Sequence, residues 1–336
     1  MKKFMAIALC LLLSIPMIFA NGESEQAQKK EYVIKLGHSM TTQSPRHQAL
    51  LEFKSYVEAQ SNGQIKVELF PAGVLGKEAE MVESLKMGNL EAYVGGPFDA
   101  LTEKLNLILM PFFFDSQESL MKVAHSDLGA QIMDDAKKNN IKILAFGNGG
   151  SRNITNNVRE IKTPADMAGI KLRTPPMKSI IECMKSLGAN PVSIPYADTY
   201  MALKTGVADG QENPLANIVD MKFYEVQKYM TYINYQFHPE VLSMNLNFFN
   251  NLPQDLQKIC VDGGWVFANK LNEIRKNTDQ DYYNVIKDSG VKIYTPTADE
   301  VELFREACAP VYDYFINEGS FTQAELDQMR TITQGN

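Results

Sequence analysis

The 336-residue chain is long enough for two domains of ordinary size, and its 45% hydrophobic and 22% charged residues are typical of a globular protein, not of a disordered one. Its formal net charge of −7 argues against nucleic-acid binding.

The first 20 residues have the layout of a secretory signal peptide. Lys2 and Lys3 precede an apolar run that ends at Phe19, and Ala20 offers a small residue before a polar segment. An uncleaved membrane anchor is the alternative, but the run is short for a membrane span and Pro16 interrupts it. Removal of residues 1–20 takes away two lysines and no acidic residue, so the mature chain would carry a net charge of −9. We expect an exported, periplasmic protein in which residues 21–30 form a flexible leader.

Strand and helix patterns alternate in the first half of the chain. Apolar residues alternate with polar ones, or form short apolar runs, over 32–36, 65–69 and 92–94, which predicts strands there. Between these strands we expect one helix that Ser44 and Pro45 begin and a second that ends at Gly88. The alternation predicts an α/β protein with a mainly parallel sheet and helices on its faces.

The second half continues this pattern. We expect a strand over 141–146 that runs into a hinge or tight turn at 147–150, and further strands over 170–173 and 192–195. A helix should begin near Thr163 and Pro164. The pattern from Gln254 to about Lys287 is helical almost without a break, on the order of 50 Å in length, which suggests an element that runs along two domains.

Three cysteines remain after removal of the leader, and an odd number rules out a complete set of intramolecular disulfides. Cys308 lies on an apolar stripe with helical spacing, so we expect it to be a buried free thiol. A disulfide between Cys183 and Cys260 remains open.

Sequence motifs of the common hydrolases, phosphate-binding loops and paired-cysteine sites are missing from the chain. We therefore expect a protein that is not an enzyme, with no catalytic residue, no metal and no cofactor. The histidines also lack the spacing of metal ligands: His38, His47, His125 and His238. His38 is nevertheless a candidate contact because it follows the first strand, where ligand-facing loops begin.

Two polar segments are candidate binding sites. Arg173 ends its strand, and ligands of open α/β sheets bind outside the carboxyl ends of strands. Its guanidinium group could hold a carboxylate by two parallel hydrogen bonds, although on position alone a surface arginine is the commoner case. In the segment Asp209–Pro214, Asn213 either caps the helix that Pro214 begins or also donates to an anion at the positive helix end.

Three segments make the sequence recognisable: GIKLRTP at 169–175, DGQENP at 209–214 and FYEVQKY at 223–229. They strongly resemble the solute-binding proteins of tripartite ATP-independent periplasmic (TRAP) transporters. The segments at 36–38, 70–72, 75–78 and 252–253 fit the same family, in the expected order.

The resemblance implies a periplasmic-binding-protein-like fold in which two α/β lobes surround a ligand cleft. Crossing strands would join the lobes, and one long interdomain helix would brace them. We expect lobe I to comprise 31–150 and 239–278, and lobe II to comprise 151–238 and 279–336. Closure on the ligand would then be a hinge motion.

The resemblance also implies which residues bind. Arg173 matches the arginine that binds the substrate carboxylate, Asn213 the asparagine that assists it, and Arg152 a second arginine. Tyr196 matches an aromatic position that packs against the ligand, and it could equally belong to the core.

One carboxylate contact does not supply the roughly 8 kcal/mol of micromolar binding. Residues of lobe I must therefore contact the rest of the ligand, and the candidates are His38, Gln43, Glu78, Phe98 and Asn148.

Glu78 would repel a second carboxylate and accept hydrogen bonds from hydroxyl groups. The expected ligand is therefore a small organic anion of the sugar-acid type, such as a hexuronate. A C4-dicarboxylate becomes viable if Arg46 points inward, although a solvated residue in the first helical turn is favoured for Arg46.

The predicted function is that of a monomeric extracytoplasmic receptor that delivers this anion to TRAP membrane subunits. The alternatives are a ligand-sensing subunit for a membrane sensor kinase and a hydrolase or isomerase of sugar acids.

Overall fold

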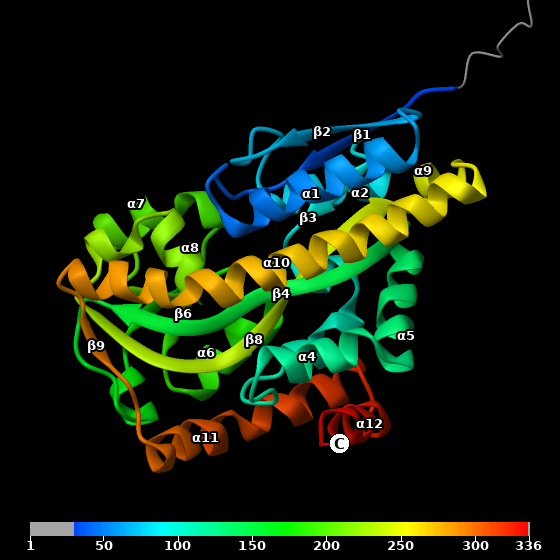
Figure 1. Cartoon of the computed structure of the whole chain (residues 1–336). Helices are drawn as coiled ribbons and strands as arrows, with labels where there is room; N and C mark the ends of the chain where they lie inside the picture. The colour runs from blue at the N-terminus through cyan, green and yellow to red at the C-terminus, as the bar shows by residue number, and fades with distance from the viewer. Residues whose placement is uncertain (1–29, 335–336) are drawn as a thin grey trace, which may run out of the picture. The chain divides into compact units, whose positions relative to one another are not determined.

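A computed structural model describes residues 30–334 (Figure 1). The predicted signal peptide and residues 21–29 of the predicted leader lie outside the described residues. The strands are β1 (Tyr32–Gly37), β2 (Ile65–Phe70), β3 (Ala92–Val94), β4 (Ile141–Asn156), β5 (Lys171–Thr174), β6 (Asn190–Ser193), β7 (Gly210–Pro214), β8 (Tyr229–Asn245) and β9 (Lys292–Tyr294).

The predicted helices are present, and several shorter ones lie between them. The α-helices are α1 (Pro45–Gln60), α2 (Glu78–Met87), α3 (Phe98–Leu101), α4 (Gln117–Ala124), α5 (Asp127–Asp135), α6 (Lys178–Ser186), α7 (Thr199–Lys204), α8 (Leu215–Asp220), α9 (Leu246–Asn250), α10 (Gln254–Asp288), α11 (Ala298–Asn317) and α12 (Gln323–Gln334). Short 3-10 helices span Glu103–Leu109, Ala136–Asn139, Pro164–Met167, Tyr196–Asp198 and Phe223–Val226. The helix start predicted at Thr163 is thus a single 3-10 turn.

The strands form one mixed sheet in the order β2-β1-β3-β8-β4-β7-β5-β6, with β9 beside β8. Strands β1, β2 and β3 pair in parallel, and β5 pairs in parallel with β6 and β7. Strands β4 and β8 join these two groups and are antiparallel to each other and to β7 and β3. The prediction of a mainly parallel sheet is therefore confirmed within each group and wrong between them, because a chain that crosses to the second group and returns must run in opposite directions.

Residues 147–150 continue β4, so the predicted tight turn is wrong. The pairing of β4 with β8 shifts register between Asn148 and Ser151, which marks a bulge inside a long strand. Gly150 has a φ of +87°, and a Cβ there would lie 3.1 Å from Cβ of Pro214 and 3.2 Å from Nη1 of Arg275. Glycine therefore meets both a conformational and a steric requirement of the bulge. The hinge role of this segment stays a prediction.

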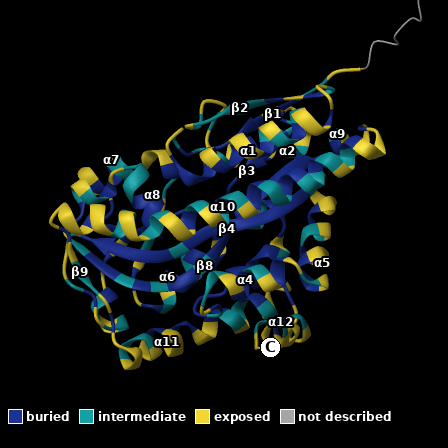
Figure 2. Ribbon diagram, in the orientation of Figure 1, coloured by how far each residue is buried: buried dark blue, intermediate teal, exposed yellow. Residues whose placement is uncertain are grey.

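Helix α10 confirms the long helical pattern and contacts both groups of strands and helices (Figure 1). One apolar cluster joins its first half, through Phe267, to α1 and β1–β3. A second cluster joins its last turns, through Ile286, to α7 and α8. Figure 2 shows β4 running beside this helix, with β8 next to β4, and both strands are mostly buried.

The described cysteines are buried. Sγ of Cys183 lies 3.5 Å from Sγ of Cys308, where α6 packs on α11, so the structure does not support a bridge from Cys183 to Cys260. Burial raises the pKa of the Cys260 thiol to about 12, which keeps it protonated at neutral pH. Among the helices of residues 30–334, none is long and apolar enough to cross a membrane.

Two glycines let α10 approach its neighbours closely. A Cβ on Gly263 would lie 2.7 Å from Cγ2 of Val57 in α1, and one on Gly264 would lie 2.8 Å from Cβ of Leu144 in β4. Both distances are below normal contact, so larger residues would push the helix away from α1 and β4.

We expect Gly263→Ala to destabilise the protein by about 1–2 kcal/mol. Overpacking a core costs about 1–3 kcal/mol, and the better helix propensity of alanine returns up to about 1 kcal/mol. Urea unfolding measures the difference, with Asn277→Ala on the exposed side of α10 as the control, expected to stay within about 0.5 kcal/mol of the parent. A Gly263→Ala variant as stable as the parent would show that the close approach is not required.

Candidate functional site

A cavity of about 40 Å³ lies where the two groups of strands meet, and side chains from both groups line it. This volume holds about three water molecules. An organic ligand can therefore enter only if the two sides separate. The lining residues are Arg46, Glu78, Gly96, Phe98, Arg152, Arg173, Pro175, Met177, Tyr196, Asn213, Asn217 and His238.

Arg173 lies near the end of β5, and its side chain is 1% exposed. Its Nε donates to the carbonyl oxygen of Ile194 at 2.9 Å, whereas its buried Nη2 has no partner within residues 30–334. Burial lowers the pKa of Arg173 to about 10, and the nearby charge of Arg152 adds to that effect while Glu212 opposes it. Arg173 therefore carries a buried positive charge with spare donor capacity.

Arg152, on β4, has a carboxylate partner. Its Nη2 donates to Oε1 of Glu212 at 2.8 Å and to the Glu212 carbonyl oxygen at 3.0 Å, and its Nε donates to Oε2. Tyr235 donates to the same carboxylate at 2.6 Å. Burial alone would lower the pKa of Arg152, but the Glu212 carboxylate outweighs it and raises the pKa. This bidentate pair is neutral as a unit.

Arg46 is 5% exposed and lines the cavity, so the expectation of a solvated Arg46 is wrong. Its Nη2 lies 2.9 Å from Oε2 of Glu240, a residue of β8, and its Nη1 donates to the carbonyl oxygen of Val94 at 3.4 Å. Burial opposes the charge, but Glu240 and Glu78 raise the pKa of Arg46. The partner on β8, distant in sequence, is what turns this helix residue inward.

Glu78, the first residue of α2, faces the cavity from the same side as Arg46. Its Oε1 accepts a hydrogen bond of 2.7 Å from Ser39, and it forms no ion pair within the described residues. The site thus contains one carboxylate that is held by a hydroxyl group and not by a cation.

Tyr196 and Phe98 form apolar parts of the wall. The Tyr196 hydroxyl donates to the carbonyl oxygen of Asn217 at 3.1 Å, and its ring packs edge-on against Phe223 at 5.9 Å between centroids. Tyr196 therefore belongs to the core and to the cavity wall at once. The ring of Phe98 lies 5.9 Å from that of His238.

Asn213 lies inside β7, so the prediction that it caps a helix is wrong. Pro214 keeps an extended conformation, with φ −62° and ψ 153°, and α8 begins only after it. The Asn213 amide donates to Oε1 of Gln211 at 2.5 Å, and its Oδ1 faces Nδ2 of Asn217 at 3.3 Å and Nη2 of Arg152 at 3.4 Å.

Three predicted contact residues lie outside this cavity. His38 is fully buried against His47 of α1, with 3.1 Å between Nε2 and Nδ1, and burial together with Arg46 lowers its pKa to about 2. Gln43 is exposed in the loop before α1. Asn148 lines a different cavity, of about 590 Å³, because the bulge after Asn148 changes the alternation of side chains before Arg152 is reached.

Sequence reasoning missed three polar or flexible lining residues: Met177, Asn217 and His238. Burial lowers the pKa of His238 well below its usual value, and the charges of Arg152, Arg275 and Arg46 contribute, so His238 is neutral. His238 lies in the middle of the long buried strand β8. Met177 follows the motif at 169–175, and Asn217 follows the motif at 209–214. Their proximity depends on the sheet order, which no local pattern carries.

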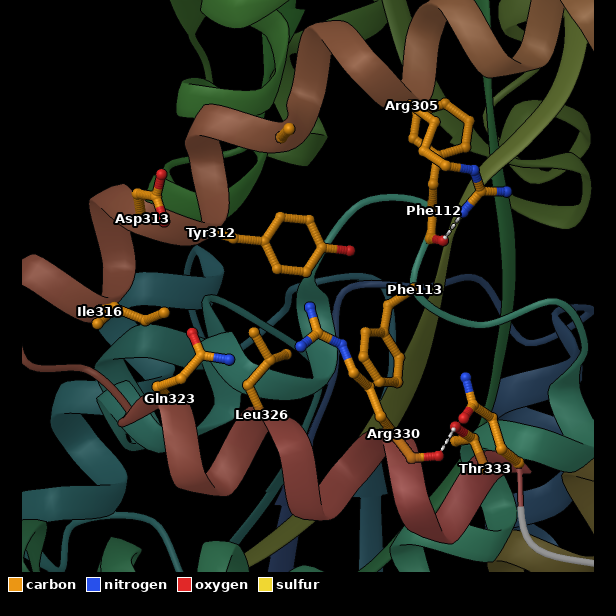
Figure 3. A pocket seen from close by; sticks show the side chains of 12 residues that line it. Phe112, Phe113, Arg305, Tyr312, Asp313, Ile316, Gln323, Leu326, Arg330 and Thr333 are labelled. Carbon is orange, nitrogen blue, oxygen red and sulfur yellow. Dashed lines mark hydrogen bonds between the residues drawn. The ribbon is translucent and has the colours of Figure 1, made fainter.

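A cavity of about 470 Å³ lies elsewhere, between α11, α12 and the loop at Phe112 and Phe113 (Figure 3). Its arginines already have acidic neighbours, because Arg305 pairs with Glu302 and Arg330 with Asp327. The arginine charges of this cavity are therefore compensated, unlike that of Arg173. We take the smaller cavity, which Arg173 lines, as the functional site.

Comparison with known proteins identifies the family of the chain. Residues 36–318 match the family described as bacterial extracellular solute-binding protein, family 7. The chain is 28% identical to the 2,3-diketo-L-gulonate-binding periplasmic protein YiaO of Escherichia coli, over 78% of this chain and 80% of that one. It is also 28% identical to the C4-dicarboxylate-binding periplasmic protein DctP of Rhodobacter capsulatus, over 92% and 90% of the two chains.

A solved TRAP periplasmic solute-binding protein of Haemophilus influenzae, with bound L-gulonate, superposes with a TM-score of 0.86 at 29% identity, over 90% of this chain and all of that one. The fold is thus the two-lobe α/β fold of periplasmic binding proteins, as predicted. The family match covers most of the sequence, and the chain therefore belongs to extracellular solute-binding protein family 7, the solute-binding proteins of TRAP transporters.

Proposed function

We propose that this receptor binds a hydroxylated monocarboxylate, a sugar acid such as a hexuronate, with the carboxylate on Arg173 and hydroxyl groups near Glu78. The observation that carries the proposal is the incomplete pairing of Arg173, whose buried Nη2 has no partner within residues 30–334. A ligand carboxylate could accept two parallel hydrogen bonds from this guanidinium group.

The charges around the cavity support one carboxylate and not two. Arg152 is neutralised by Glu212 and Arg46 by Glu240, so that Arg173 and Glu78 are left as one positive and one negative group. A first carboxylate would neutralise Arg173. A second would meet Glu78, and like charges at close range in a partly buried site cost several kcal/mol, about 4 kcal/mol at 4 Å.

The relatives are consistent with this proposal and also supply its alternative. Two of them carry names or ligands of the gulonate type, and one carries the name of a C4-dicarboxylate receptor. Arg46 does point inward, which would favour a dicarboxylate, but Glu240 already holds it at 2.9 Å. We therefore place the C4-dicarboxylate second.

Membership in the family supports the transport role in the rest of the proposal. We infer a receptor without catalytic activity that is exported through a cleavable signal peptide, works in the periplasm as a monomer and delivers its ligand to TRAP membrane subunits. Residues 151–238 and 279–336 would move as lobe II against lobe I, which comprises 31–150 and 239–278. Presentation of the bound form to a sensor kinase is the alternative role, and in that case uptake of the ligand by whole cells would not depend on this protein.

A thermal-shift screen of uronates, aldonates, C4-dicarboxylates and 2-oxoacids tests the ligand class. A ligand present at 100 times its dissociation constant stabilises the folded protein by about 2.7 kcal/mol. We expect the largest rise in melting temperature from a sugar acid. A screen in which no carboxylate raises the melting temperature would contradict the proposed function.

Arg173→Met should lower the affinity for the sugar acid by about 100-fold, because it removes two charge-assisted hydrogen bonds of about 1.5 kcal/mol each. The same change should stabilise the ligand-free protein by about 1–2 kcal/mol. Folding lowers the pKa of Arg173, which means that the fold disfavours its charged form, and that cost is present at every pH below about 10.

Calorimetric titration and urea unfolding measure these two effects. Arg159→Met is the matched control, because Arg159 is exposed and should change neither quantity measurably. Unchanged affinity in Arg173→Met would remove Arg173 from the binding role.

Glu78→Gln should shift the preference of the site toward dicarboxylates. The amide keeps hydrogen-bonding capacity but removes the charge that would repel a second carboxylate, so the ratio of dicarboxylate to sugar-acid affinity should rise by at least about tenfold. Competition titrations on parent and variant measure that ratio. If it stays constant, Glu78 does not select the ligand class.

A further inference from the structure

The loop between β1 and α1 reaches across to the other group of strands and helices. Met40, in this loop, is 2% exposed and belongs to the apolar cluster that contains Tyr196, Leu215 and Ile218. Those three residues come from the segment after β6 and from α8. Met40 thus buries its side chain in a cluster whose other members lie on the far side of the cavity.

Thr41, the next residue, adds a polar contact at the same place. Its hydroxyl donates to Oδ1 of Asp220, the last residue of α8, and its backbone nitrogen donates to Oδ2 at 3.3 Å. Thr41 therefore engages both carboxylate oxygens of Asp220, although 179 positions separate these two residues along the chain. Neither Met40, Thr41 nor Asp220 lines the ligand cavity.

Other contacts join the same two sides but are weaker candidates. Lys77, before α2, lies 2.8 Å from Asp198, but both side chains are about half exposed, and such ion pairs contribute little. The backbone nitrogen of Lys178 in α6 donates to Asp99 of α3 at 3.3 Å. Of these three contacts between described residues, only that of Met40 and Thr41 combines a buried apolar side chain with two hydrogen bonds to a charged group.

We propose that Met40, Thr41 and Asp220 form a latch that holds the cleft closed, and that these residues set the affinity of the receptor without touching the ligand. The proposal rests on the proposed function, because only a receptor whose two sides separate needs such a latch. The contact must break before a ligand can reach a cavity of about 40 Å³, and it forms again on closure.

Weakening the latch should affect ligand binding differently from removing a residue that contacts the ligand. Here the state that retains the ligand is the closed one. The apparent dissociation constant equals the intrinsic dissociation constant divided by the fraction of molecules in that closed state. Weakening the latch should therefore lower the affinity for every ligand by the same factor and leave selectivity unchanged. A residue such as Glu78, which faces the cavity, should instead change the ratio between ligands.

The test measures closure without any ligand. In a Lys77→Cys/Asp198→Cys reporter, a short bis-maleimide can join the two cysteines only while the two sides are close, so the yield of cross-linked protein follows the closed fraction. The native cysteines in the described residues are buried and serve as an internal check by peptide mass spectrometry. The reporter is then combined with Thr41→Val, Asp220→Asn, both together, and Thr41→Ser.

We expect Thr41→Val and Asp220→Asn each to lower the cross-linking rate about fivefold, the effect of losing one hydrogen bond to a charged group at a partly exposed site. The effect of the double variant should be smaller than the two single effects combined, because both changes weaken the hydroxyl–carboxylate contact. Thr41→Ser, which keeps the hydroxyl group, should cross-link at close to the parent rate. Asp262→Asn, in the exposed pair with Lys258, is the control and should have no effect.

Melting temperatures of all variants verify that they are folded. Equal rates in the parent, Thr41→Val and Asp220→Asn would overturn the latch, as would a reporter that never cross-links or a double variant whose two effects add. A failure of every carboxylate in the thermal-shift screen would instead contradict the proposed function and leave the cross-linking result standing.

Discussion

A buried arginine is stable only when a carboxylate or several hydrogen bonds compensate its charge, and this constraint organises the site. Arg152 and Arg46 satisfy it through Glu212 and Glu240, which reach them from β7 and β8. Arg173 satisfies it only in part, through one carbonyl oxygen. Among the arginines that line the cavity, Arg173 is therefore the one without a carboxylate partner within residues 30–334, and in our proposal the ligand carboxylate supplies that partner.

The sheet explains how these charges come together. Strands β4 and β8 pass through both groups of the fold and carry Arg152, His238 and Glu240, while the shorter β5 and β7 deliver Arg173 and Asn213. Because β4 and β8 continue from one side to the other, the two walls of the cavity share a covalent frame. The remaining contacts across the cavity, such as that of Thr41 with Asp220, are non-covalent and reversible.

Much of the fold could be predicted from local patterns, because strand alternation, helix caps and the long helical pattern of α10 can be recognised from neighbouring residues. The course of β4 through its glycines could not, since Gly147, Gly149 and Gly150 look the same in a turn and in a bulge. The antiparallel direction of the joining strands was missed for a related reason: strand direction between distant segments leaves no local signal.

The residues of the site can likewise be divided into those that the sequence indicated and those that it did not. Arg173, Asn213, Arg152 and Tyr196 were found by resemblance to the family, and Glu78 and Phe98 as candidates in lobe I. The structure brings all six to one cavity. Arg46 was assigned to solvent because its partner Glu240 lies 194 residues away, and His238 and Asn217 gave no signal at all. Asn148 was misplaced because a single bulge reverses which face of β4 its side chain occupies.

The most direct test of the central claim is a crystal structure of the mature protein with a bound sugar acid identified by screening. The account predicts that the ligand carboxylate lies about 2.7–2.9 Å from the guanidinium nitrogens of Arg173, with hydroxyl groups of the ligand within hydrogen-bonding distance of Glu78. A ligand whose carboxylate is bound by Arg46 or Arg152, with Arg173 left without an anionic partner, would contradict it.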